Sequence, residues 1–358
     1  PTTGVFSTRS RQAMVDFIEN RYENGMDILD FEGNWRYADR VRALAAEVIN
    51  SESDEIFFSG SGSEMLNVIS NGIIVQPSSN VVTTDLSFPS TPYTWMNRLG
   101  VHNVRIGKSV NGQIDTEDLL ALVDNDTVAI SICLVENTSG YRHDVEDIGK
   151  FCRENNILFI LDATQCIGAM EIDVKKMHID FLIATTYKWL SGPFGISFAY
   201  VSNRIVNDIK PVYVGWTGNK DRHNHSRYLL DLEDGAKRFE LGSLNWIGLK
   251  GIEQSMLLYL ELGKSNVEEY ILSLTDYFYE QISQLESVRL IGPFRNGNRS
   301  GISYIEFPEE WKLTDRILRE NGIRAHVAGK NTIRIGLHFY NNNEDIDVFI
   351  NFIKQRGK

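Results

Sequence analysis

Short apolar stretches alternate with amphipathic stretches along the chain from about residue 35 to residue 202. The apolar stretches have the length of single strands, and several are apolar at successive positions, as strands covered on both faces are. Between them, apolar residues recur at helical spacing, as at Val41, Leu44, Ala45 and Val48. The alternation predicts an α/β fold in which helices cover both faces of a mostly parallel sheet of the seven-stranded type.

The pattern also places the individual elements of this region. We expect helices over 35–50, 64–70, 91–99, 116–122 and 144–154, and strands over 56–58, 81–84, 101–106, 127–134, 157–161, 181–184 and 196–201.

The pattern changes after residue 210. Residues 211–243 are rich in Gly, Asp, Asn and His, which is typical of loops near a functional site. The spacing of apolar residues over 245–284 predicts one long or broken helix. Further strands are expected over 288–290, 302–305, 322–326 and 332–335, with helices over 311–320 and 344–354. We therefore expect a large domain over residues 15–245, preceded by an arm of residues 1–14, and a small C-terminal α+β domain over residues 246–358.

Composition excludes several functional classes. The 358 residues carry a net charge of −12, which argues against nucleic-acid binding through clustered basic side chains. The apolar stretches are far shorter than the roughly 20 residues of a membrane helix, and no secretory signal is visible. Three cysteines are too few for a disulfide framework, so we expect a cytoplasmic protein. The chain begins with Pro1, which leaves the natural N-terminus open. A metabolic enzyme is the leading class.

A run of small residues, Ser59-Gly60-Ser61-Gly62-Ser63, lies between a predicted strand and a predicted helix. Small residues let the backbone approach an anion, and the N–H groups at a helix start point at it. The run matches neither the dinucleotide-binding nor the P-loop pattern. Alone, it indicates either a phosphate site or a serine-capped turn.

Two charged residues each follow a predicted strand. Asp162 ends an apolar strand at the edge where parallel sheets bind ligands, although a helix-capping role is equally compatible with its position. Lys188 follows the next strand within Thr185-Thr186-Tyr187-Lys188-Trp189, and partial burial would lower the pKa of its amine as Schiff-base chemistry requires. The alternative is a surface lysine with a buried stem.

The order of these three features resembles the fold type I pyridoxal-phosphate enzymes, specifically the class V aminotransferase and cysteine desulfurase group. The resemblance implies an enzyme with pyridoxal 5'-phosphate as cofactor. It implies that Asp162 pairs with the pyridinium nitrogen, that Gln165 contacts the phenolic oxygen and that Lys188 forms the Schiff base. The phosphate would be bound by Gly62, Ser63, Thr185 and Tyr187.

Other segments extend the resemblance over nearly the whole chain. Phe88 stands where a ring stacks on the cofactor, and Asn137 where an Asn touches substrate and cofactor oxygen. Arg238-Phe239-Glu240-Leu241-Gly242-Ser243 resembles the family's RFExG[ST] stretch, whose hydroxyl, here Ser243, reaches the phosphate of the neighbouring subunit. Arg334 matches the arginine that binds the substrate α-carboxylate, and His338 follows it closely enough to face the substrate.

Some positions depart from the desulfurases. Phe88 and Tyr187 stand where desulfurases usually have histidines, and in this they resemble the kynureninases. The RFExG stretch, however, fits the kynureninase family poorly. The segment before the Arg334 strand, residues 325–331, lacks the desulfurase's nucleophilic cysteine, and all three cysteines lie before residue 170. Cys166 follows Gln165 and is expected to point into the core.

Without that cysteine, three reactions at the substrate Cα carbanion remain. They are β-elimination, epimerisation and transamination. We prefer β-elimination on a cysteine derivative, a C–S lyase-like activity. The alternatives are an epimerase, a class V aminotransferase, a desulfurase with an atypical sulfur acceptor, and a non-catalytic relative that keeps the fold for binding.

The partners implied are an amino-acid substrate and a second copy of the chain, because the family is dimeric with its active site at the interface. Neither nucleic acid nor membrane is expected. His223 and His225 form a His-x-His pair, but no third ligand stands at convincing spacing, so no metal is predicted.

Overall fold

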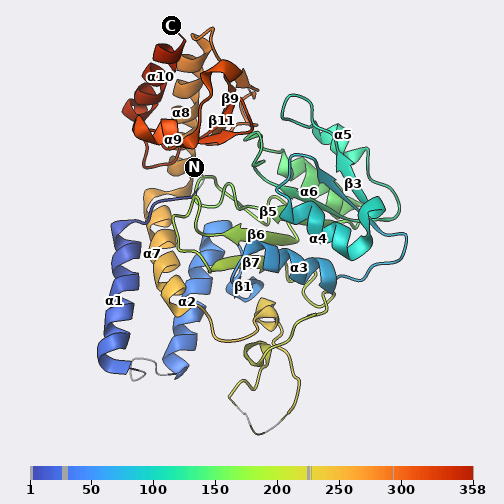
Figure 1. Cartoon of the computed structure of the whole chain (residues 1–358). Helices are drawn as coiled ribbons and strands as arrows, with labels where there is room; N and C mark the ends of the chain where they lie inside the picture. Colours follow the sequence, from blue (N-terminus) through green and yellow to red (C-terminus); the bar gives the residue numbers. More distant parts are fainter. Residues whose placement is uncertain (1–2, 26–30, 224–225, 227, 293, 358) are drawn as a thin grey trace.

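The computed structural model describes residues 3–25, 31–223, 226, 228–292 and 294–357. In this part of the chain a seven-stranded sheet has the order β1-β7-β6-β5-β4-β2-β3, and all strands except β7 run parallel to one another. The strands are β1 (Ile56–Ser59), β2 (Asn80–Thr84), β3 (Val104–Gly107), β4 (Thr127–Cys133), β5 (Leu158–Asp162), β6 (Phe181–Thr185) and β7 (Ser197–Val201). The predicted mostly parallel α/β sheet is therefore confirmed (Figure 1).

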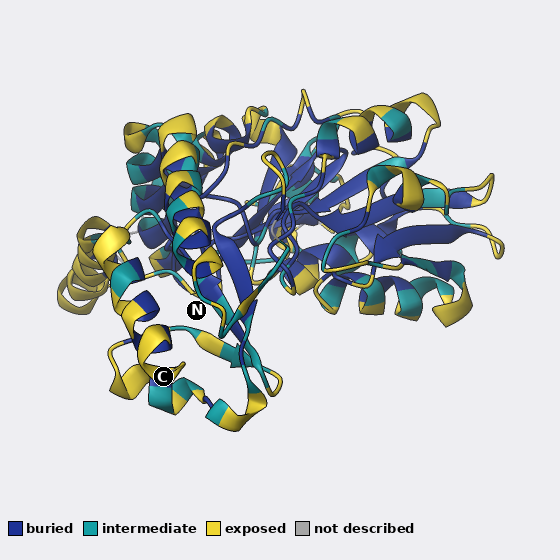
Figure 2. Ribbon diagram, turned by 90° about the horizontal axis from the view of Figure 1, so that it is seen from above, coloured by how far each residue is buried: buried dark blue, intermediate teal, exposed yellow. Residues whose placement is uncertain are grey.

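Strand side chains alternate between two apolar cores, one on each face of the sheet. Phe159 and Leu161 of β5 belong to one core and Ile160 to the other, and Leu182 and Ile183 of β6 divide in the same way. Both faces are covered by helices, so the strands lie in the buried interior of the large domain (Figure 2). This burial explains why the strands are apolar at successive positions.

Helices α2 to α6 connect the strands or precede them. Their bounds are α2 (Phe31–Ile49), α3 (Gly62–Gly72), α4 (Ser90–Leu99), α5 (Thr116–Leu120) and α6 (Val145–Glu154). The predicted helix over 245–284 is broken at Gly263, whose φ of 85° ends α7 (Trp246–Leu262) and precedes α8 (Lys264–Ser283). A positive φ strains residues with a Cβ, which is why a glycine stands at the break.

A second sheet of four antiparallel strands has the order β10-β11-β9-β8. Its strands are β8 (Arg289–Ile291), β9 (Ile302–Glu306), β10 (His326–Ala328) and β11 (Thr332–Gly336), and α9 (Asp315–Glu320) and α10 (Asn343–Arg356) complete this part. Ile333 and Ile335 of β11 face a third apolar core shared with α8 and α10, whereas Ile302 and Tyr304 of β9 belong to a core of the large sheet. The small sheet thus turns one face toward the large domain. The predicted boundary at residue 246 stays a prediction.

Two details of this region differ from the sequence analysis. The expected strand over 322–326 is wrong, because Gly322 has a φ of 76° and β10 begins only at His326. The expected helix over 311–320 is split: a 3-10 turn ends at Trp311, Lys312 is left-handed, and α9 begins after Thr314, whose side chain accepts from Ile317 N.

One helix was not predicted at all. Residues Thr8–Asn24 form α1, which packs along α7 (Figure 1). Within this contact Ser10 and Ser255 are hydrogen bonded at 2.9 Å between their hydroxyls. The segment expected to be an arm over residues 1–14 is therefore helical from Thr8.

A buried ion pair connects α2 to the RFExG segment. The Arg42 guanidinium lies 2.6 and 2.7 Å from the two carboxylate oxygens of Glu240, and both side chains are 1% exposed. Glu240 also accepts a hydrogen bond from Phe58 N of β1, directly before the run of small residues at 59–63.

We expect Arg42→Met to lower the free energy of unfolding by about 3–5 kcal/mol, because it leaves a buried carboxylate without its cation. Urea denaturation measures the change. Arg9→Met is the matched control, since the Arg9–Glu261 pair is about half exposed and such pairs contribute about 1 kcal/mol or less. Equal losses in the two variants would contradict the prediction.

Candidate active site

Several predicted site residues stand at the carboxyl ends of parallel strands. Asp162 is the last residue of β5 and pairs with Cys133, the last residue of β4, while Thr185 ends β6. Phe88 follows β2 by four residues and Asn137 follows β4 by four. Since the ends of parallel strands meet at one edge, the fold collects these side chains from separate parts of the sequence.

Asp162 is a buried carboxylate with few partners. It is 7% exposed, and its Oδ1 accepts a hydrogen bond from Thr164 N at 2.8 Å. Burial raises the pKa of Asp162, while the hydrogen bonds from Thr164 and the charge of Lys188 act against this shift. A positively charged group bound in the site would therefore stabilise the ionised form of this carboxylate.

Lys188 follows β6 and is 9% exposed. Its Nζ lies 5.7 Å from the centroid of the Phe88 ring and 5.9 Å from that of Tyr187. Burial lowers the pKa of Lys188 to about 8, although Asp162 favours its charged form, and the charge of Arg334 lowers the pKa further. An amine with this pKa is substantially neutral near pH 8 and can act as a nucleophile or base.

We expect the rate at which cofactor-free protein takes up pyridoxal phosphate to rise with pH through a midpoint near 8. Only the neutral amine of Lys188 attacks an aldehyde, and its depressed pKa makes it neutral well below the ordinary value of 10.5. Stopped-flow absorbance over pH 6–10 measures this profile. A midpoint near 10.5 would show that the lysine behaves as a solvated amine.

Several predicted site residues have buried polar atoms without a hydrogen-bond partner. Among the described residues they include Oε1 of Gln165, Oγ1 of Thr185, and Nε and Nη2 of Arg334. The amide of Gln165 is fixed on its other side, where Nε2 donates to Asn137 Oδ1 at 2.7 Å. Because buried polar groups ordinarily have partners, these atoms fit a polar ligand such as pyridoxal phosphate with an amino acid.

The run of small residues forms the N-terminus of α3. The Ser61 side chain caps it by accepting from Glu64 N, which leaves the first amides of the helix without intrahelical acceptors. A Cβ at Gly62 would lie 3.0 Å from methyl carbons of Ile183 and Thr185, so only glycine fits there comfortably. The unpartnered hydroxyl of Thr185 and this helix start together suit a phosphate. Ser63 is exposed, and its hydroxyl lies 2.8 Å from that of Ser90.

Arg334 lies in the middle of β11, opposite Tyr304 of β9. The Tyr304 hydroxyl donates to the backbone oxygen of Asn137 at 2.5 Å and so connects the small sheet to the strand ends of the large one. Burial raises the pKa of Tyr304 to about 12, and Arg334 opposes the shift. The guanidinium of Arg334 therefore stands beside the same site as Asn137.

The structure shows the surroundings of two further predicted site residues, His338 and Ser243. His338 is 5% exposed, stacks on Trp189 with ring centroids 5.1 Å apart, and stacks on Tyr340 at 4.1 Å; burial lowers its pKa to about 4. Its ring is thus packed behind Lys188 as a neutral side chain. Ser243 is exposed and lines a cavity with Tyr213, Leu241 and the Ser59–Gly60 end of the run of small residues. Both assignments stay predictions.

The aromatic residues at the site differ in their surroundings. Phe88 is 43% exposed, so its ring is accessible for stacking on a planar ligand. Tyr187 packs on Phe194 with ring centroids 4.4 Å apart.

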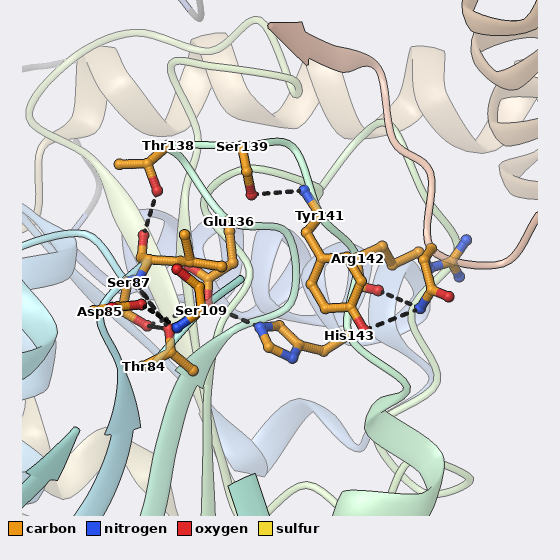
Figure 3. Close-up of polar contacts among 12 residues, drawn as sticks. Thr84, Asp85, Ser87, Ser109, Glu136, Thr138, Ser139, Tyr141, Arg142 and His143 are labelled. Atoms are coloured by element: carbon orange, nitrogen blue, oxygen red, sulfur yellow. Dashed lines mark hydrogen bonds and ion pairs between the residues drawn. The ribbon is translucent and has the colours of Figure 1, made fainter. Parts of the chain in front are cut away.

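Sequence reasoning missed a buried polar network centred on Glu136. This side chain is fully buried, and its Oε1 lies 2.8 Å from both Thr84 Oγ1 and His143 Nε2 (Figure 3). Thr84 Oγ1 in turn accepts from the backbone amides of Leu86 and Ser87. The network therefore fixes the turn that leads to Phe88. A glutamate directly before the predicted Asn137 was the signal available in the sequence.

None of the cysteines is available as a nucleophile. Cys133, Cys152 and Cys166 are at most 2% exposed, and burial raises the pKa of each thiol. The Cys166 thiol donates to Ala163 O at 3.2 Å, which confirms that it points into the core. The short hairpin between β10 and β11 contains no cysteine.

Over the described ranges, no three His, Cys, Asp or Glu side chains are grouped as a metal site. His225 lies outside those ranges. No described helix is long and apolar enough to cross a membrane.

The family model of class V aminotransferases matches residues 11–349. Similar curated proteins include a probable cysteine desulfurase from Methanothermobacter thermautotrophicus, 27% identical, with 87% of this chain and 82% of the relative covered. An uncharacterised aminotransferase from Schizosaccharomyces pombe is 29% identical, with 89% and 81% covered.

Solved structures show the same fold. A cystine C–S lyase in complex with its reaction product cysteine persulfide superposes with a TM-score of 0.89 at 19% identity, with 99% of this chain and 95% of that chain covered. The cysteine desulfurase from Thermococcus onnurineus gives a TM-score of 0.82 at 21% identity, with 98% and 94% covered.

Proposed function

The chain belongs to the class V aminotransferase family of pyridoxal-phosphate enzymes, and we propose that it catalyses β-elimination on a cysteine derivative. The products would be a thiol, pyruvate and ammonia. One water is consumed, because the three-carbon fragment loses its amino group by hydrolysis after the carbon–sulfur bond breaks.

The state of the cysteines is the observation that carries this proposal. Transfer of sulfur to the enzyme requires a thiolate that reaches the substrate, and the three thiols of this chain are buried with raised pKa values. β-Elimination needs no such thiolate, since the sulfur leaves with its substituent. The buried thiols therefore support elimination over transfer of sulfur to the enzyme.

The residues at the strand ends suit the parts of this reaction. Bound pyridoxal phosphate would accept the electron pair released at Cα. Lys188 would remove the Cα proton at its Nζ, for which a pKa of about 8 is well matched to neutral conditions. Arg334 would bind the α-carboxylate through its unpartnered Nε and Nη2 and so orient the Cα–H bond toward the lysine.

The remaining contacts would hold the cofactor. Asp162 would keep a proton on the ring nitrogen, and Gln165, whose Nε2 donates to Asn137, would contact the ring oxygen. Thr185 and the start of α3 at Gly62 and Ser63 would bind the phosphate. Phe88 would cover the ring and keep water from its face.

Product analysis tests the proposed reaction. The holoenzyme is mixed with S-ethyl-L-cysteine, and pyruvate and ethanethiol are quantified together with the chirality of the remaining amino acid. We expect the two products in equal amounts. Conversion to the D-enantiomer would instead establish an epimerase, and a stoichiometric pyridoxamine form of the cofactor would establish an aminotransferase.

We further propose a cytoplasmic homodimer with Ser243 of each chain near the partner's phosphate site. The cavity beside Ser243 is lined by the exposed side chains Tyr213 and Leu241, and exposed apolar side chains of this kind favour association. Light scattering should give twice the mass of one chain.

A further inference from the structure

A cavity of about 600 Å³ lies next to Arg334, on the face of the small sheet that turns toward the large domain. It is lined by Thr3, Asp315, Arg319, Gly322, Arg324, Ala325, His326 and Arg334. Thr3 connects it to the lysine, because the following residue, Gly4, donates from its backbone N to Tyr187 O at 3.0 Å. The cavity therefore extends from the predicted carboxylate site toward the small-domain surface.

Positive charge dominates this cavity although the chain as a whole is acidic. Three arginines line it, and Asp315 is the one carboxylate among its lining residues. That carboxylate is already engaged, since one oxygen accepts from Val327 N at 2.6 Å and the other lies 3.0 Å from His326 Nδ1. Three arginines against one carboxylate leave the cavity with an excess of positive charge, although Asp315 interacts with the charge of Arg319.

Arg324 is available to a ligand. It is exposed, and within the described part of the chain it makes no hydrogen bond or ion pair. It precedes β10 by two residues, and the first residue of β10, His326, stands directly opposite Arg334 in the β10–β11 pair. Arg324 and Arg334 therefore line the same cavity. His326, which also lines it, is two residues after Arg324 and pairs with Arg334.

We propose that this cavity is a second anion site, in which Arg324, assisted by Arg319, binds a carboxylate at the far end of the substrate side chain. The inference rests on the proposed function for its substrate class: cysteine conjugates whose sulfur substituent ends in an anionic group. One arginine suffices for the α-carboxylate, and the planar guanidinium of a second one recognises a second carboxylate in the same way.

Binding of dead-end ligands tests the site without any turnover. Isothermal calorimetry of the holoenzyme compares pimelate, whose two carboxylates are separated by five chain atoms as in S-(2-carboxyethyl)-L-cysteine, with hexanoate, which has one carboxylate. We expect pimelate to bind about tenfold more tightly, because it makes one more charge-assisted contact, and Arg324→Gln to bring the ratio of the two Kd values close to one.

The matched control is Arg316→Gln. Arg316 lies on α9, its side chain is 82% exposed, and it pairs with Glu320 outside the cavity. It should keep the tenfold ratio. Equal affinities in the unaltered enzyme, or an unchanged ratio in Arg324→Gln, would overturn the second anion site.

Kinetics separate this inference from the proposed reaction. S-(2-Carboxyethyl)-L-cysteine and S-propyl-L-cysteine differ only in the distal group, and Arg324→Gln should lower the ratio of their kcat/KM values about tenfold. A ratio that does not change would count against the second anion site. If neither compound released pyruvate, the proposed β-elimination would fail, and the calorimetric ratio would still decide the anion site.

Discussion

Replacing Lys188 with alanine is expected to lower kcat by about 10⁴-fold and to abolish the visible absorption of the lysine-bound cofactor. Lys188 is the lysine that stands at the strand ends beside Asp162 and Arg334, and burial gives it the lowered pKa that a nucleophilic amine needs. Absorbance spectra of the purified variant with added pyridoxal phosphate, followed by steady-state kinetics, measure both effects.

Lys250→Ala is the matched control. Lys250 lies on α7, is also partly buried with a lowered pKa, and has its Nζ 3.6 Å from the centroid of the Tyr37 ring, in a different part of the molecule. It should retain the absorption band and the activity. A normal band in Lys188→Ala would mean that another group carries the cofactor.

The second large effect is expected from Asp162→Asn, which should lower kcat by about 10²–10³-fold while leaving the cofactor-free protein at least as stable as before. The amide keeps an acceptor for Thr164 N but removes the charge that would hold a proton on the ring nitrogen. Burial raises the pKa of Asp162, so ionised Asp162 lowers the stability of the folded protein. This loss of stability is complete above the folded pKa and disappears as the pH falls to the unfolded pKa. Removing the charge therefore relieves this loss of stability wherever Asp162 is ionised.

Asp180→Asn provides a control with the opposite outcome. Asp180 is also buried, but it lies directly before β6, at the opposite edge of the sheet from Asp162, and its carboxylate accepts from Phe159 N at 3.0 Å and from the Nε of Arg204 at 3.1 Å. Thermal unfolding should show a lower Tm for this variant with kcat retained. A Tm loss in Asp162→Asn as large as in Asp180→Asn would contradict a functional role for the Asp162 charge.

The large sheet could be predicted because its strands are covered on both faces and therefore carry apolar residues at successive positions, as β5 and β6 do. The helix α1 could not, because only Ser10, Met14 and Phe17 of it are buried, too few to mark an apolar face. The strand expected over 322–326 failed for a local reason. Gly322 has a positive φ that ends the preceding turn and delays the strand.

Some residues of the candidate site could also be predicted from the sequence, whereas the contacts between others could not. Asp162 and Lys188 could be found because Asp162 ends an apolar strand and Lys188 lies three residues after the next one, where a charge is costly without a purpose. The pair of Glu136 and His143 could not, because seven residues separate them and the chain must turn back for the ring to meet the carboxylate (Figure 3). Nor does the sequence show that His338 stacks behind Lys188 on Trp189.

The product formed from L-cysteine tests the central claim most directly. β-Elimination converts the carbon skeleton to pyruvate and releases sulfide, whereas transfer of sulfur to an enzyme thiol leaves alanine. Mass spectrometry of the three-carbon product, with purified holoenzyme and a reductant present, distinguishes the two. We predict pyruvate with sulfide in equal amount, as expected of a site whose three cysteines are buried; alanine as the main product would contradict the account.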